Sequence, residues 1–180
     1  MKRVVFLMVA ALMAASLAFA QGGSIGIFKD MAGTNCNLDD KVPGLTPYYV
    51  VHVNTPAATA CEFYAPKPTC LTAMYLSDTG VFPVTVGSSQ AGVSIGYGTC
   101  RSAPIHVLTL NFFTQGTTGA CCRYSVLPHP ITGGPWMVDC GNTQRMATGG
   151  QGLVNANSTC MCDVPAEDTT WGQVKSLYGE

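Results

Sequence analysis

The chain is poor in charged residues and in the residue runs that build long helices. Only 11% of its 180 residues are Asp, Glu, Lys or Arg, and windows rich in Glu, Lys and Ala are almost absent. Nine basic residues face ten acidic ones and form no basic run, which argues against nucleic acid or an anionic membrane surface as a partner. These shortages disfavour a helical protein and leave strands as the expected elements.

Long apolar runs are absent beyond the first twenty residues. Residues 2–3 are basic, residues 4–17 are almost entirely apolar, and the sequence AFA at 18–20 has the small residues that a signal peptidase requires before Gln21. The run is too short for a comfortable membrane span, and no cysteine follows it that could carry a lipid anchor. We therefore predict a signal peptide over 1–20 and a secreted protein, extracellular or periplasmic, without a membrane span in its mature part.

All nine cysteines lie after the predicted cleavage point, and in an exported chain they indicate a disulfide framework. The disulfide candidates are Cys36, Cys61, Cys70, Cys100, Cys121, Cys122, Cys140, Cys160 and Cys162. Because nine is odd, at least one thiol stays free, capped or paired with another chain. Two local pairings are favoured, since each would cross a short hairpin: Cys61 with Cys70, and Cys121 or Cys122 with Cys140.

Alternating apolar residues predict an all-β domain over residues 21–165. The strongest segment, 105–113 (IHVLTLNFF), has one almost wholly apolar face and is expected to be a central strand. No helix-length connection separates the shorter segments, which favours an antiparallel β-sandwich of about 8–10 short strands, stabilised by disulfides. The other expected strands cover 24–28, 47–55, 58–65, 71–76, 82–86, 91–97, 120–127, 136–140 and 146–154.

Three local features refine this prediction. Residues 77–80 (SDTG) are expected to form a turn that ends the strand over 71–76. Pro83 cannot donate to a strand ladder, so its segment is expected at a sheet edge. Gly92, Ser94 and Gly96 share one face of their strand, where another backbone could approach closely.

The last segment, 166–180, has the one convincing helical pattern after the signal peptide. Trp171, Val174, Leu177 and Tyr178 fall on one helical face, and Thr170 begins a capping box. A helix this short is marginal alone, so the tail is expected to pack on its own domain or to serve as an interaction tail for a partner. The structural cap is the favoured alternative.

The tail string EDTTWGQVKSLYGE resembles a C-terminal motif, T-T-W-G-x-(I/V)-K-x-L-(Y/F), of uncharacterised secreted proteins from environmental bacteria. The preceding domain, with SIGIF, a Tyr-Val-Val-His-Val strand and a Cys-x-Cys pair, is similar to members of that group. The resemblance implies export by a bacterium and a shared sorting or docking handle, and it implies no activity. In architecture alone, the pattern resembles cohesin-like and other immunoglobulin-like β-sandwich modules.

Metal sites have weak support in the sequence. Asn35, Asn37 and Asp39 alternate oxygen ligands as a calcium loop does, but the expected glycine and downstream Glu are missing. A copper set of His52, Cys122, His129 and Met137 has too many residues between its second and third members. We therefore expect no cofactor.

Catalytic motifs are equally weak. The segment GSSQA at 87–91 lacks the last glycine of a nucleophile elbow and precedes a strand where a helix is required. The sequence favours a non-catalytic secreted domain for binding, adhesion or assembly, with a protein or a surface glycan as partner. The alternative is a small secreted metalloprotein or enzyme with a site near Cys121, Cys122, His129, Cys160 and Cys162.

Overall fold

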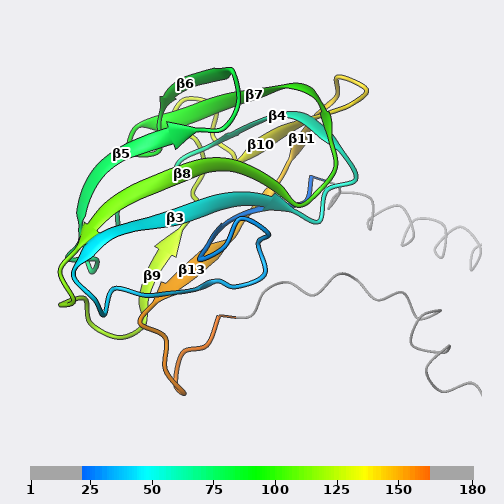
Figure 1. Ribbon diagram of the computed structural model, residues 1–180. Helices are drawn as coiled ribbons and strands as arrows, with labels where there is room; N and C mark the ends of the chain where they lie inside the picture. Colours follow the sequence, from blue (N-terminus) through cyan, green and yellow to red (C-terminus); the bar gives the residue numbers. More distant parts are fainter. Residues whose placement is uncertain (1–21, 163–180) are drawn as a thin grey trace, which may run out of the picture.

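Two β-sheets pack face to face in the computed structural model, which describes residues 22–162 (Figure 1). The first sheet has the strand order β12-β1-β3-β8-β5. Its pairings are antiparallel, apart from the parallel pairing of β1 with β12. Its strands are β1 (Ser24–Phe28), β3 (Gly44–Val53), β5 (Met74–Gly80), β8 (Ile105–Thr114) and β12 (Thr148–Gly149).

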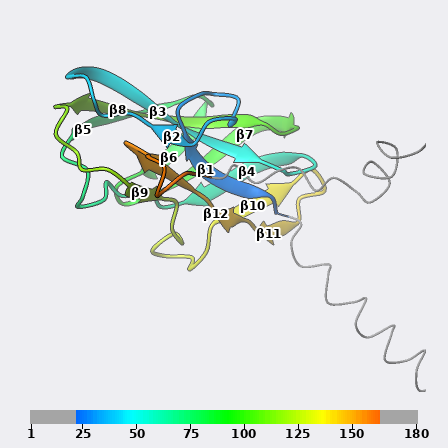
Figure 2. The same ribbon diagram turned by 90° about the horizontal axis from the view of Figure 1, so that it is seen from below.

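The second sheet has the order β11-β10-β4-β7-β6 and is antiparallel throughout. Its strands are β4 (Ala58–Phe63), β6 (Val84–Ser88), β7 (Gly92–Arg101), β10 (Trp136–Asp139) and β11 (Gln144–Met146). A small third sheet, β2 (Asn37–Leu38), β13 (Gln151–Val154) and β9 (Cys122–Ser125), closes one end. Seen from below, β3 and β8 lie on one side of the sandwich, and β10 and β11 lie on the other (Figure 2).

The expected central strand is β8, which pairs with β3 on one side and β5 on the other. Its alternation breaks once, where Val107 and Leu108 are both fully buried. Opposite this point, Val50 of β3 pairs with Leu108 and the next residue, Val51, pairs with His106. Val107 is therefore the extra residue of a β-bulge. The bulge lets two consecutive apolar side chains of β8 reach the core.

Side chains of all three sheets form one core. Tyr48 and Phe112 of the first sheet have ring centroids 5.4 Å apart, and Tyr124 of the third sheet meets Phe112 edge-on. From the second sheet, Phe63 and Ile95 complete the cluster. Burial of these aromatic and branched residues supplies the main stabilisation of the fold.

The structure confirms the all-β antiparallel sandwich, with differences in detail. Within residues 22–162 it has thirteen strands, and several have only two or three residues, too few to give a recognisable alternation in the sequence. The turn predicted at residues 77–80 is wrong: β5 continues to Gly80, because Ser77 and Thr79 pair with β8. The strand after Pro83, β6, is an edge strand, as expected. The tail over 166–180 and the signal peptide over 1–20 lie outside the described residues.

Four disulfides connect the sheets and loops: Cys36–Cys162, Cys70–Cys122, Cys100–Cys140 and Cys121–Cys160. Both predicted local pairings are therefore wrong. Cys61 is a free thiol, because its side chain points into the core between the sheets, while Cys70 lies in the loop after β4 and meets the third sheet. Cys140 pairs with Cys100 at the end of β7 instead of with either adjacent cysteine.

Candidate functional site

The outer face of the second sheet carries two rows of side chains that cross all five strands. The first row is Val84, Gly96, Ala60, Val138 and Gln144. The second row is Val86, Ser94, Glu62, Trp136 and Met146. Because each row follows the strand register, its members share one face of the sheet.

Small residues in the middle of these rows leave a hollow, which we call the outer groove. Gly96, Ser94 and Ala60 form its floor, with Val84 and Val86 on one side and Trp136 on the other. The groove has a volume of about 180 Å³. A Cβ added at Gly96 would lie 3.4 Å from the Cβ of Val84, so even one methyl group would begin to fill the space. This is the face on which the Gly and Ser pattern predicted a close approach.

A polar cluster sits at one end of the outer groove. Thr132 donates its hydroxyl to Oε1 of Glu62 at 2.8 Å, and Nδ1 of His129 lies 3.0 Å from the same oxygen. The indole N–H of Trp136 donates to the carbonyl of Thr132 at 3.3 Å. The cluster therefore fixes the Trp136 ring and places one carboxylate beside an apolar surface.

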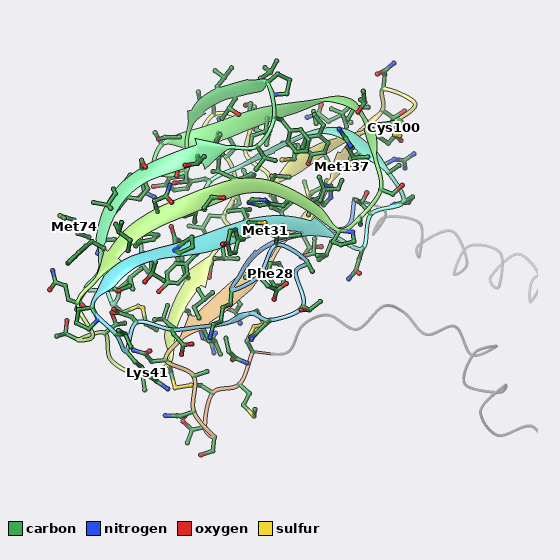
Figure 3. All side chains as sticks on the ribbon, in the orientation of Figure 1. Phe28, Met31, Lys41, Met74, Cys100 and Met137 are labelled. Atoms are coloured by element: carbon green, nitrogen blue, oxygen red, sulfur yellow. A yellow bond between two sulfur atoms is a disulfide. The ribbon has the colours of Figure 1, made fainter. Side chains whose placement is uncertain are left out.

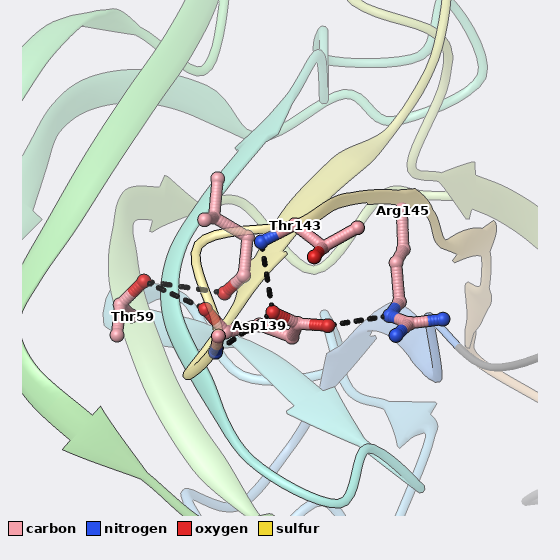
Figure 4. A network of polar contacts seen from close by, with 6 residues as sticks. Thr59, Asp139, Thr143 and Arg145 are labelled. Carbon is pink, nitrogen blue, oxygen red and sulfur yellow. Dashed lines mark hydrogen bonds and ion pairs between the residues drawn. The ribbon is translucent and has the colours of Figure 1, made fainter.

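The wall formed by β10 and β11 is held by Asp139 (Figure 4). Its Oδ1 accepts the backbone N–H of Thr143 at 2.9 Å, and its Oδ2 accepts Nε–H of Arg145 at 2.7 Å. These hydrogen bonds lower the pKa of Asp139. The hydroxyl of Thr59 donates to the carbonyls of Val138 and Asp139, so the hairpin is also tied to β4.

The residues expected near a sulfur-rich metal site are placed differently from that expectation. Cys121 bridges Cys160, and Cys122 and Cys162 bridge cysteines elsewhere. A sulfur atom in a disulfide cannot act as a thiolate ligand. The prediction of a sulfur-ligated metal site at these positions is therefore wrong. Within residues 22–162, no three His, Cys, Asp or Glu residues group in a way that could hold a metal ion.

His52 lies in the interior, where its ring contacts residues outside the copper set. Its Nε2 contacts the carbonyl of Gly22 at 2.8 Å, and its Nδ1 contacts the hydroxyl of Tyr97 at 3.3 Å. Burial lowers the pKa of His52. The neighbouring Cys61 thiol interacts with the same Tyr97 hydroxyl, and burial raises the pKa of Cys61 to about 12. The cluster is a neutral, sequestered polar contact within the core.

The three calcium candidates each have another partner. The Asn35 side chain accepts the backbone N–H of Asn37 at 2.9 Å, and the Asn37 side chain accepts the N–H of Cys162 at 3.2 Å. Asp39 forms an ion pair with Lys29. The side-chain oxygens thus stabilise the chain on both sides of β2.

The sequence pattern indicated the Gly and Ser face, but it did not identify Glu62, Trp136 or Thr132 as site residues. Trp136 lies in the strand expected over 136–140, whereas Thr132 lies in the turn before that strand. Only the pairing of β10 with β4, which places Trp136 opposite Glu62, brings them to the same groove.

Comparisons with known proteins identify no family for the chain. The chain matches no family model and no curated protein. Among solved structures it is similar to the sixth cohesin of scaffoldin B from Acetivibrio cellulolyticus, solved in complex with a mutant Cel5 dockerin. The identity is 16% and the TM-score 0.47, over 76% of this chain and 99% of the cohesin.

The expected loose likeness to cohesin architecture is therefore found, at values too low to carry an argument about function. The resemblance to secreted bacterial proteins with the TTWG tail stays a prediction. A function for the chain therefore rests on its own residues.

Proposed function

We propose that the protein is a non-catalytic extracellular binding domain and that its partner binds in the outer groove. The observation that carries this proposal is the groove itself, with a floor of small residues between exposed valines and a fixed tryptophan. Specific binding sites are concave and mainly apolar, with a few well-placed polar groups. Glu62 at one end of the groove is such a group.

The chemistry of the lining favours a polypeptide over a glycan. A sugar presents many hydroxyl groups, each of which loses hydrogen bonds to water when it is buried against aliphatic side chains. Val84, Val86 and Val138 offer no such partners, whereas they match the apolar side chains of a peptide segment. The carboxylate of Glu62 adds a preference for a Lys or Arg in that segment.

Features typical of exported proteins support the same proposal. Four disulfides are typical of proteins that fold in an oxidising compartment. Within residues 22–162, no helix is long and apolar enough to cross a membrane. Together with the predicted signal peptide, the disulfides favour an extracellular or periplasmic location.

Random peptides displayed on phage provide a direct test. Selection on the immobilised mature chain should enrich peptides that carry apolar side chains beside a basic residue. Ser94→Phe fills the floor of the groove and should abolish their binding. Ser102→Phe places the same ring on an exposed loop and should leave binding unchanged. Glu62→Gln keeps the size of the side chain and should weaken binding by removing the charge.

Two results would contradict the proposal. Enriched peptides that bind Ser94→Phe as well as the parent protein would place the site elsewhere. A glycan array tested with the same variants supplies the second: sugar binding that Ser94→Phe abolishes would identify a carbohydrate partner.

A further inference from the structure

The outer face of the first sheet has an exposed apolar row at one end. Leu45, Phe113 and Met74 are direct neighbours in the register of β3, β8 and β5. Their exposed fractions are 77%, 41% and 54%. We call these three residues the apolar row, and Met74 marks it at the left of Figure 3. Three large apolar side chains side by side on a small domain are a typical interaction surface.

The described chain ends on this same face. Cys162 is bridged to Cys36 and packs against a small cluster that includes Phe28 and Tyr49. Tyr49 and Leu45 are four residues apart in β3, so their side chains point to the same side of the sheet. The eighteen residues that follow Cys162 therefore start on the face that carries the apolar row.

The chain that follows Cys162 is long enough to reach the apolar row. Phe28 pairs with Tyr49, and the distance along β3 from Tyr49 to Leu45 is about 13 Å at 3.3 Å per residue. Residues 163–168 can extend over about 20 Å before the helical pattern begins. The outer groove lies on the opposite side of the sandwich, so the apolar row is the nearer exposed apolar surface.

We propose that the C-terminal tail docks on the apolar row of its own domain, as a short helix that covers Leu45, Phe113 and Met74. The tail supplies a matching stripe, Trp171, Val174, Leu177 and Tyr178. A helix of this length is marginal alone and gains stability by burying that stripe. Docking removes both exposed apolar surfaces from water in one contact.

Fluorescence of Trp171 tests this contact. The chain has two tryptophans, so Trp136→Phe leaves Trp171 as the single reporter in the mature protein. In the docked state its emission should be blue-shifted and protected from iodide. Leu45→Lys and Phe113→Lys, each at an exposed position, should shift the emission to the red and increase iodide quenching. Val86→Lys, at a position that is 65% exposed on the other sheet, is the matched control and should change neither.

Each other result overturns the proposal. Emission typical of water in the parent protein, unchanged by Leu45→Lys, would show that the tail does not dock. A response to Val86→Lys instead would place the tail in the outer groove. Protection that disappears on dilution would identify a second copy of the chain as the occupant. None of these outcomes depends on whether peptides bind the outer groove.

Discussion

The two outer faces of the sandwich differ in how much of each is covered. On the first sheet, the loop over 29–36 lies across Val51 and Val53. Gly33 approaches so closely, with a φ of +69°, that a Cβ there would lie 2.7 Å from Val53. On the second sheet, small residues in the strands themselves leave an open groove. The first sheet is therefore covered by a dedicated loop, whereas the second is left open because its strands carry glycine, alanine and serine.

Hydrogen bonds within the covering loop and a disulfide at its end fix the position of the loop. Asp30 accepts the backbone N–H groups of Thr34 at 3.0 Å and Asn35 at 2.7 Å. Burial raises the pKa of Asp30, but these hydrogen bonds outweigh it and lower the pKa overall. The Cys36–Cys162 bridge then ties the end of this loop to the segment after β13. This difference between the faces can be tested by variants that act on one of them.

The largest effect is expected from the bridge on the covered face. Cys36→Ala with Cys162→Ala opens a closure over 126 residues, and Cys100→Ala with Cys140→Ala opens one over 40 residues on the second sheet. Because Cys70–Cys122 and Cys121–Cys160 stay closed, the first bridge closes an effective loop about as long as the second, and chain entropy predicts a loss of about 4 kcal/mol in the free energy of unfolding for either pair. The first pair should lose more in total, because the covering loop is then no longer held over Val51 and Val53. Urea denaturation of both double variants measures this. A greater loss for the second pair would contradict the role given to the covered face.

A smaller effect separates buried from exposed valines. Val51 lies under the loop with no exposed surface, whereas Val86 is 65% exposed at the edge of the outer groove. Val51→Ala should lower the free energy of unfolding by about 2 kcal/mol, because it removes buried methyl groups and leaves a cavity. Val86→Ala should change it by less than about 0.5 kcal/mol. Equal losses in thermal or urea unfolding would show that the two faces are covered alike.

Local patterns predicted the parts of this fold that depend on one strand at a time. The alternation in 105–113 located β8, and Pro83 located the edge strand β6. The Gly92, Ser94 and Gly96 face was predicted as an approach surface and forms part of the groove face. In each case the side chains of one short segment decide the outcome.

Contacts between distant segments could not be predicted in this way. The extra residue Val107 depends on the register between β3 and β8, which no single strand contains. The SDTG segment has turn composition, yet pairing with β8 keeps it extended in β5. Cys61 lies nine residues from Cys70 but faces the core, so closeness in sequence gave the wrong disulfide.

The stability of the protein should depend on pH through His52, which lies in the interior between the two sheets. Burial lowers the pKa of His52 from 6.5, so below pH 6.5 the unfolded chain binds a proton that the folded one resists. Stability is therefore unaffected by this group at higher pH and falls as the pH drops below 6.5. His52→Gln should lower stability at pH 8 and reduce the slope below pH 6.5. An unchanged slope in urea titrations at several pH values would contradict the assignment.

The smallest effect is expected for Cys61, because burial keeps reagents in solution from reaching its thiol. Its thiol is buried, and its pKa is raised to about 12. Ellman's reagent should find no thiol in the folded mature chain and one thiol after denaturation without reductant. Cys61→Ala should leave none in either state. Reactive thiol in the folded protein would show that the core is open at this point.

The burial of Cys61 also governs which oxidation product survives. Nine thiols can form four bridges in roughly nine hundred ways, and the odd thiol is the agent that could exchange one arrangement for another. While the chain is still opening and closing, that exchange corrects wrong bridges. Once the two sheets close over Cys61, the internal catalyst of exchange is withdrawn, and the arrangement present at that moment is kept. Closing the core therefore also ends the correction of disulfide pairing by this thiol.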